Sequence, residues 1–145
     1  MSLKLSSIKR DLAKENEGDW VDIPEWAGVR LKVRSINSRD YSIAREILVG
    51  KLARNFGRIP TSPEMEPALA KLVAQHLLRG WDGIIVGDGE TPTEYSAKLA
   101  LDLLVDPEMR DLEQQVIWAA NRVGDRDAEF TVDAAKNSAV PSVTT

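Results

Sequence analysis

Cysteine is absent from the sequence, and His76 is the only histidine. The lack of cysteine excludes disulfide bonds, thiol catalysis and zinc sites built on cysteine. One histidine is also too few for a typical transition-metal site. His76 falls on the same helical face as Leu69 and Leu72, which is typical of a half-buried structural histidine. The sequence therefore predicts neither a bound metal nor a cofactor.

Long apolar runs are missing as well. No stretch approaches the roughly 20 apolar residues that a membrane-spanning helix needs. Met1–Arg10 lacks the apolar segment of a secretory signal peptide. We therefore expect a cytoplasmic protein that does not contact membranes.

Net positive charge is also lacking, because the chain carries −4 at pH 7 and has a pI of about 5.1. A general nucleic-acid-binding protein needs a basic face to displace counterions, so this balance argues against nucleic acid as a partner. Residues 1–58 hold 12 Lys and Arg against 8 Asp and Glu, a net +4, whereas residues 59–145 hold 7 against 15, a net −8. This asymmetry favours partners of opposite charge or head-to-tail self-association, although a chance spread of solvated charges explains it equally.

The 145 residues fit one domain, which begins with a small sheet. Apolar and basic residues alternate through segment 29–34, which predicts a strand with one wet face. Trp20–Ile23 is expected to be its antiparallel partner, with PEWAG as the turn between them. The alternating residues are Val29, Arg30, Leu31, Lys32, Val33 and Arg34.

Helical patterns follow the sheet. The first begins after Ser38 as N-cap and ends at Gly57, a residue suited to a left-handed C-terminal cap. Its apolar stripe holds Tyr41, Ala44, Leu48, Leu52 and Phe56. The second pattern has Ser62 as its expected cap, Pro63 at the first helical position and Gly80 as its end.

Two further helices are expected near the C-terminus. One covers Ser96–Val105, and the other opens at Asp106-Pro107 and continues to Val123. The second helix and the helix over Ser96–Val105 are separated by residues 81–95, WDGIIVGDGETPTEY. This stretch lacks the acidic spacing of a calcium loop and the lysine of a phosphate-binding loop. We therefore expect a third strand over Trp81–Val86 or a chain running into a Gly-Asp-Gly turn, followed by a helix start at Thr91 or Ser96.

The predicted fold class is α+β: mostly helical, with four to five helices and a small antiparallel sheet near the N-terminal third. Residues 1–18 form an arm or short helix, residues 19–123 one globular domain and residues 124–145 a flexible tail, because periodicity is lost after Gly124.

Candidate functional residues are few, and none of them is catalytic. The sequence has no G-x-S-x-G motif to expose a nucleophile, and Glu64 and Glu66 sit in a helix first turn, where the helix dipole explains them. We therefore expect a protein without enzymatic activity. The candidates for partner binding are Arg30, Lys32 and Arg34, which with Arg39 form a basic stripe, together with Trp118, one position off an apolar stripe, and Phe130 in the tail segment EFTVDAAKN.

Taken in order, several segments resemble the tail assembly chaperones of long-tailed bacteriophages. They are W-x-x-I-P-E-W-x-G-x-x-L-K-V-R from Trp20 to Arg34, then Leu77-Leu78-Arg79-Gly80-Trp81-Asp82-Gly83-Ile84, then Tyr95-Ser96, Leu103-Leu104 and an Asp-Pro helix. The resemblance spans roughly Asp19–Asn137. It contains no catalytic fingerprint, only a pattern of Trp, Gly and Leu.

The resemblance implies a non-enzymatic role in tail assembly. Such proteins bind the tape measure protein, keep its helical and apolar segments from aggregating, and recruit tail tube protein in the host cytoplasm. They are absent from the mature virion. Three other readings stay open: a virion structural part such as a tail completion or connector protein, a small nucleic-acid-binding regulator that uses the basic stripe, and a hydrolase that depends on His76.

Overall fold

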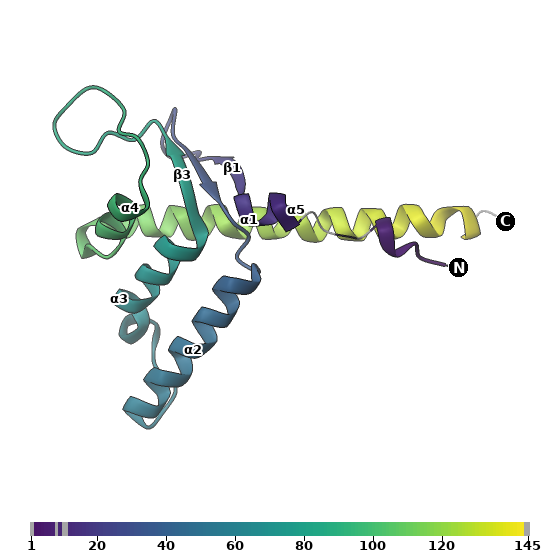
Figure 1. The fold of residues 1–145 in the computed structure, drawn as a ribbon, viewed down its shortest axis with the longest axis horizontal. Coiled ribbons are helices and arrows are strands. Elements are labelled where there is room, and N and C mark those ends of the chain that lie inside the picture. Colours follow the sequence, from purple (N-terminus) through teal and green to yellow (C-terminus); the bar gives the residue numbers. More distant parts are fainter. Residues whose placement is uncertain (1, 8, 10–11, 144–145) are drawn as a thin grey trace.

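The computed structural model describes residues 2–7, 9 and 12–143, and it describes the backbone but not the side chains of residues 7, 14 and 127–143. Three antiparallel strands and a larger number of helices form an α+β fold, as the sequence predicted (Figure 1). In chain order the elements are η1 (Leu5–Ser7), α1 (Leu12–Glu17), β1 (Asp19–Asp22), β2 (Arg30–Val33), α2 (Arg39–Phe56), α3 (Ser62–Leu72), the π-helical turn η2 (Val73–Leu77), β3 (Leu78–Asp82), α4 (Ala97–Leu104), η3 (Pro107–Met109) and α5 (Arg110–Val143).

The sheet has the order β1-β2-β3. β1 and β2 form the predicted hairpin, with Asp19 opposite Val33 and Asp22 opposite Arg30. The alternation in β2 places Leu31 and Val33 in the core, where both are fully buried. Because residues that lie opposite each other in a sheet share a face, Trp81, which pairs with Leu31, also points into the core.

The third strand begins earlier than the sequence suggested. β3 spans Leu78–Asp82, so Gly80 lies within a strand and does not end a helix. The π-helical turn η2 ends the preceding helix, and Leu78 is the first residue with an extended backbone. Gly80 pairs with Lys32, and a Cβ atom on Gly80 would lie 3.3 Å from the Lys32 Cβ. The missing side chain therefore relieves crowding against Lys32 on the neighbouring strand, a contact that local sequence does not reveal.

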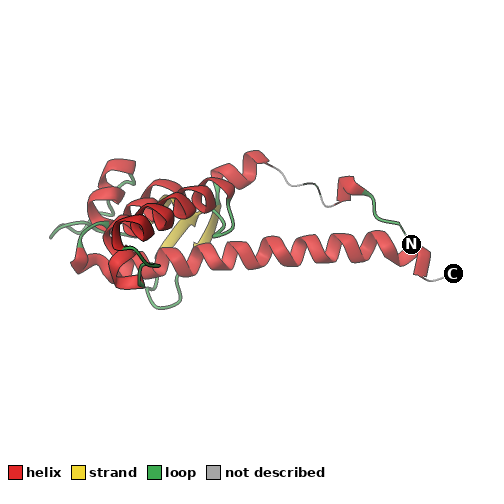
Figure 2. Cartoon of the chain, turned by 90° about the horizontal axis from the view of Figure 1, so that it is seen from below, coloured by secondary structure: helices red, strands yellow, loops and turns green. Residues whose placement is uncertain are grey.

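α5 runs the length of the molecule and extends well beyond the body (Figures 1 and 2). Its 34 residues span about 50 Å. The buried side chains Val116, Ala119, Ala120 and Val123 belong to the same core cluster as the sheet residues. The helix passes through Gly124 without a break, so the backbone does not show the change into a tail that the sequence suggested at this residue.

Gly124 has a packing role within α5. α5 approaches the segment after β2 so closely that Ile36 N donates a hydrogen bond to the Ala120 carbonyl oxygen at 3.0 Å. A Cβ atom on Gly124 would lie 3.2 Å from side-chain atoms of Ser35, Ile36 and Asn37. Gly124 is therefore the position at which α5 meets this segment.

Replacing Gly124 with valine is expected to destabilise the protein by about 1–3 kcal/mol, because the branched side chain overpacks this contact. The matched control is the same substitution at Gly50, another helical glycine, where an added Cβ meets nothing within 4 Å. Urea unfolding would compare the two variants. Equal stability of Gly124→Val and Gly50→Val would contradict the packing role of Gly124.

The helix starts are confirmed in part. Ser38 precedes α2 and Gly57 ends it with a left-handed φ of 70°, as predicted, but the buried Ser38 hydroxyl has no hydrogen-bond partner among the described residues. The expected cap at Ser62 is wrong by one residue, because Thr61 is the N-cap of α3. Of the two expected starts for α4, the structure selects Ser96, whose side chain accepts a hydrogen bond from Leu99 N at 3.1 Å.

The glycine-rich stretch forms a loop anchored at its base (Figure 1). Trp81 Nε1 donates to the Thr93 carbonyl oxygen at 2.7 Å, and Thr93 N donates to the Ile84 carbonyl oxygen at 2.7 Å. Thr93 Oγ1 accepts a hydrogen bond from Val86 N at 3.0 Å. Three residues of one chain segment are thus hydrogen-bonded to a single threonine, which supports the structural interpretation of this stretch.

Candidate functional site

Helices α2 and α3 form a hairpin that projects from the body (Figure 1). Tyr41, which is buried, and the half-buried Leu48 and Leu52 lie on one side of α2. At 100° per residue, a second row falls on the opposite side. We call this row the outer stripe of α2, and it consists of Ile43, Ile47, Gly50 and Arg54.

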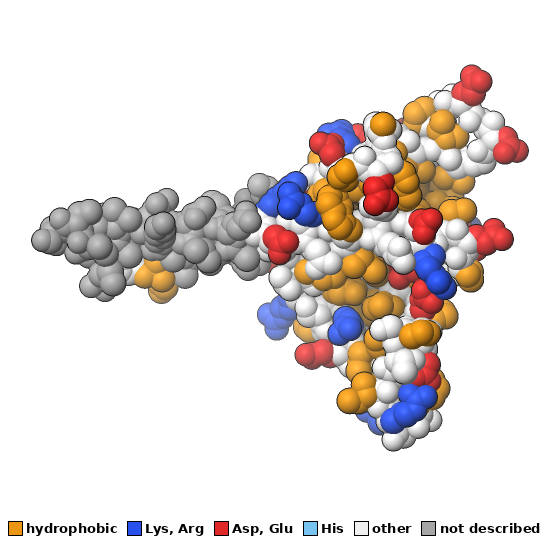
Figure 3. Space-filling model, turned by 180° about the vertical axis from the view of Figure 1, so that it is seen from behind, with side chains coloured by type: hydrophobic (Ala, Val, Ile, Leu, Met, Phe, Trp, Pro, Cys, Tyr) orange, Lys and Arg blue, Asp and Glu red, His pale blue; other side chains and the backbone are white. Residues whose placement is uncertain are grey.

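Ile43, Ile47 and Arg54 of the outer stripe are exposed, and Gly50 is half-buried. Ile43 is 45% exposed and Ile47 65%, and an added Cβ on Gly50 would meet nothing within 4 Å. Seen from behind, the projecting lobe shows hydrophobic side chains together with Lys and Arg (Figure 3). α2 therefore carries apolar residues on two sides, and the described residues bury only one of them. A helix with two apolar sides is typical of an element that packs on a second partner.

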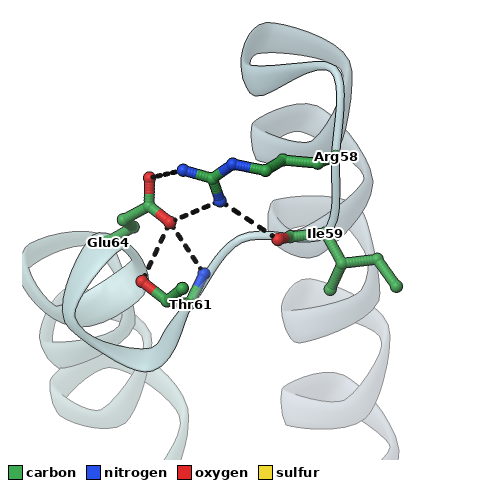
Figure 4. Close-up of polar contacts among 4 residues, drawn as sticks. All are labelled: Arg58, Ile59, Thr61 and Glu64. Atoms are coloured by element: carbon green, nitrogen blue, oxygen red, sulfur yellow. Dashed lines mark hydrogen bonds and ion pairs between the residues drawn. The ribbon is translucent and has the colours of Figure 1, made fainter.

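The tip of the hairpin is closed by an ion pair. Arg58 donates to both carboxylate oxygens of Glu64, at 2.7 and 2.9 Å, and the same carboxylate accepts from Thr61 N at 2.9 Å (Figure 4). Ile59 lies beside this network and is 81% exposed. Phe56, predicted to be in the apolar stripe of α2, is 45% exposed and stacks with Arg58. The tip thus adds two exposed apolar residues to the hairpin.

Replacing Glu64 with glutamine is expected to lower the melting temperature at pH 7 and to have a shrinking effect as the pH falls. The hydrogen bond from Arg58, followed by those from Thr61, lowers the pKa of Glu64 from its ordinary 4.5 to about 2. Its carboxylate therefore stabilises the folded state above pH 4.5, and this contribution is lost as the pH falls toward 2. Melting curves at pH 7 and at pH 3 would test this, and a difference that stays constant with pH would contradict it.

The predicted basic stripe is broken in the structure. Arg30 and Lys32 lie on the wet face of the sheet, where both contact the Trp20 ring, at 4.7 and 6.0 Å from its centroid. Arg30 pairs with Asp82, and Lys32 Nζ lies 3.0 Å from Glu17. These acids offset the positive charge that the sequence suggested for this face.

Arg34 does not lie on the wet face of the sheet with Arg30 and Lys32. β2 ends at Val33, and Arg34 is only 7% exposed. Its Nε donates to the Asn16 carbonyl oxygen at 2.6 Å, and its Nη1 lies 4.0 Å from Asp40. Burial, with a smaller effect of Arg79, lowers the pKa of Arg34, and Asp40 opposes the shift. Arg34 therefore joins α1 to the start of α2 and is not available on an open binding face, whereas Arg39 is exposed.

An open cleft of about 390 Å³ lies between α1 and the N-terminal end of α2. Arg34, Arg39 and Asp40 line it together with α1 residues such as Leu12 and Glu15. Two basic and two acidic side chains among these residues give the cleft no preference for an ion of one sign.

Trp118 is exposed, as the sequence predicted. It is 39% exposed on the solvent side of α5, and Arg122 lies 6.0 Å from its ring centroid. Phe130 lies outside the residues whose side chains the structure describes. His76 is half-buried in η2, as expected. Among the described residues, no three His, Asp or Glu side chains lie close enough together to hold a metal ion.

Comparison with known protein families gives a match to the family described as YdaY prophage protein, over residues 36–137. The match covers more than two thirds of the chain. The chain belongs to the YdaY prophage protein family. No curated protein and no solved structure matches the chain significantly.

The YdaY match begins after β2 and includes the whole α2–α3 hairpin, β3, α4 and most of α5. The outer stripe of α2 and Trp118 therefore lie inside the family region, whereas Arg30, Lys32 and Arg34 lie outside it. Within the described residues, no helix combines the length and the apolar character that crossing a membrane requires. The protein is thus a phage protein whose family region carries its exposed apolar helix.

A buried carboxylate lies where the hairpin meets α5. Glu113 of α5 is only 7% exposed. Glu66 of α3 is close enough to raise the pKa of Glu113, and Arg110, whose Nε lies 3.1 Å from Glu66, opposes this. Glu113 in turn contributes to a raised pKa of Tyr41 on α2. Glu113 therefore interacts electrostatically with residues of both hairpin helices.

Replacing Glu113 with glutamine is expected to stabilise the protein at pH 7 and to have little effect near pH 4. Burial, followed by Glu66, raises the pKa of Glu113. Because burial disfavours the charged form of Glu113, the folded state is most stable when Glu113 is protonated. This stability is present at low pH and is lost as the pH rises from the pKa of the unfolded state through that of the folded state. The uncharged glutamine removes this loss. Melting curves from pH 4 to pH 8 would show a growing advantage of Glu113→Gln, and a variant that is less stable at pH 7 would contradict the expectation.

Proposed function

We propose that this YdaY family protein is a phage tail assembly chaperone that binds the tape measure protein and recruits tail tube protein during tail assembly. It acts by binding alone, without catalysis or a cofactor, in the host cytoplasm, and it is not part of the mature virion. The observation that carries the proposal is the outer stripe of α2, an exposed apolar surface on a projecting helix of a phage protein.

The motifs behind the resemblance to tail assembly chaperones come together in space. The Trp20–Arg34 segment forms β1 and β2, and the Leu77–Ile84 segment contains β3, so Leu31 lies opposite Trp81 and Lys32 opposite Gly80. Two segments that are far apart in the sequence therefore build one sheet. This supports the interpretation of the pattern as one fold, on which the projecting hairpin is mounted.

A client with long helical segments suits the hairpin. Two helices that pack on each other use apolar residues at helical spacing on both partners. The outer stripe offers isoleucines four residues apart, and the tip adds Phe56 and Ile59. A tape measure protein rich in helical and apolar segments would supply the complementary residues.

The test is an affinity pull-down of the tagged full chain from cells that express the genes of its phage, analysed by mass spectrometry. We expect recovery of one very long helical protein together with the tail tube protein, and absence of the chain from purified particles. Detection of the chain in purified particles would favour the virion structural alternative. Recovery of neither protein would contradict the chaperone proposal.

A further inference from the structure

We propose that the outer stripe of α2 binds an amphipathic helix of a partner protein whose positions flanking its apolar seam are acidic. This inference rests on the proposed function, because it assigns the surface that engages the client. Ile43, Ile47, Gly50 and Arg54 follow one another at spacings of four, three and four residues. That spacing places them in one line along a helix, as in the seam between two packed helices.

Gly50 gives the stripe a notch. A glycine inside a helix costs about 1 kcal/mol relative to alanine. Apart from its chain neighbours and the backbone of its own helix, no atom lies within 4 Å of where its Cβ would be, so packing against another element does not account for it. Between Ile47 and Arg54, the missing side chain leaves the backbone open to a close approach by another helix. This is the feature that distinguishes the stripe from scattered exposed apolar residues.

The charges around the stripe select the partner. Arg39, Lys51 and Arg54 are exposed and lie on or beside the outer side of α2. The acidic residues of α2 are fewer, and one of them, Asp40, lies 4.0 Å from Arg34 Nη1. Glu46 is the other acidic residue of α2, and it is exposed. A partner helix with glutamates or aspartates beside its apolar seam therefore complements this surface, and one with lysines does not.

The probes are two fluorescently labelled synthetic helical peptides with the same leucine seam. One carries glutamates at the flanking positions and the other carries lysines. Anisotropy titrations with the full chain should show binding of the glutamate peptide, weakened by salt, and at least tenfold weaker binding of the lysine peptide. Equal binding of both peptides, or binding of neither, would overturn the inference.

Variants locate the surface. Ile47→Glu places a charge in the stripe and is expected to weaken binding of the glutamate peptide by about tenfold or more. The matched control is Ile85→Glu, because Ile85 is 44% exposed but lies in the 83–96 loop. Gly50→Leu should fill the notch and weaken binding while raising helix stability. A loss of binding in Gly50→Leu together with a higher melting temperature would exclude misfolding as the cause.

Three other outcomes are decisive. If sedimentation shows a dimer of the parent chain that Ile47→Glu dissociates, a second copy occupies the stripe and the partner-helix inference is overturned. If Ile47→Glu retains the tape measure protein in the pull-down as well as the parent does, this inference fails while the chaperone function stands. If the parent recovers no tape measure protein but binds the glutamate peptide through the stripe, the chaperone function fails and the surface stands.

Discussion

Replacing Gly83 with alanine is expected to destabilise the protein by about 3 kcal/mol, the largest effect of any glycine in the sheet region. Gly83 follows β3 and has a φ of 79°. An added Cβ would overlap the Gly28 carbonyl oxygen and lie 3.1 Å from the Gly28 carbonyl carbon. Both atoms belong to a backbone held by the β1–β2 turn, where Val29 N donates to the Trp26 carbonyl oxygen at 3.1 Å. A backbone obstacle cannot rotate away as a side chain does.

Gly87 supplies the control for this prediction. Its φ is 93°, but an added Cβ would meet nothing within 4 Å. Gly87→Ala therefore carries only the conformational cost of a left-handed residue, about 1–2 kcal/mol. Urea unfolding of both variants separates the two effects. If Gly83→Ala and Gly87→Ala lose the same stability, the contact with Gly28 contributes nothing.

The contact between Gly83 and Gly28 also bears on the resemblance to tail assembly chaperones. Gly28 is the glycine of the W-x-x-I-P-E-W-x-G pattern, and Gly83 is the second glycine of the Leu77–Ile84 pattern. The sequence presents them as two separate glycines, each interpretable as a turn residue. The structure places one against the other, so the two patterns depend on each other sterically.

Those parts of the fold that follow from local chemistry could be predicted from the sequence. The alternation of apolar and basic residues in segment 29–34 is enough to place Leu31 and Val33 in the core, and a glycine after an apolar helical run is enough to end α2 at Gly57. Ser96 was one of two possible caps, and only the packing of the following helix decides between them. Local patterns thus gave the elements and most of their ends.

Features that depend on distant partners could not be predicted. Gly80 resembles a helix end, yet it lies in β3 opposite Lys32, and Gly124 packs closely against residues 35–37. Arg34 continues the basic alternation, but α1 covers it through the Asn16 carbonyl oxygen. In each of these cases the deciding contact comes from a segment that is distant in the sequence.

The candidate site shows the same limit. Periodicity identifies the stripe through Tyr41, Leu48 and Leu52 as the more apolar side of α2, and the structure places it inward. The 43, 47, 50, 54 spacing is also present in the sequence, but periodicity does not mark this second row as a binding surface. The position of the hairpin on the body leaves Ile43 and Ile47 exposed. By contrast, exposure of Trp118 followed from its displacement from the Leu112–Val116 stripe.

Replacing Trp81 with alanine is expected to destabilise the protein by about 3–5 kcal/mol. Trp81 is only 4% exposed, and its ring meets Tyr95 edge to face at a centroid distance of 5.0 Å. Its Nε1 donates to the Thr93 carbonyl oxygen at 2.7 Å, and the Tyr95 hydroxyl donates to the Leu78 carbonyl oxygen at 3.1 Å. The indole therefore joins β3 to the far end of the 83–96 loop while filling the core.

Two variants divide this effect into its parts. Trp81→Phe keeps much of the apolar volume but leaves the Thr93 carbonyl oxygen without its donor, so we expect an intermediate loss of about 1–3 kcal/mol. Trp20→Ala is the control, because Trp20 belongs to the same sheet but is 40% exposed on its wet face. Its removal should cost about 1 kcal/mol or less. Urea unfolding would measure the free energy of unfolding of each variant. If Trp81→Ala loses as little stability as Trp20→Ala, backbone hydrogen bonds hold the 83–96 loop to the sheet and the buried indole does not.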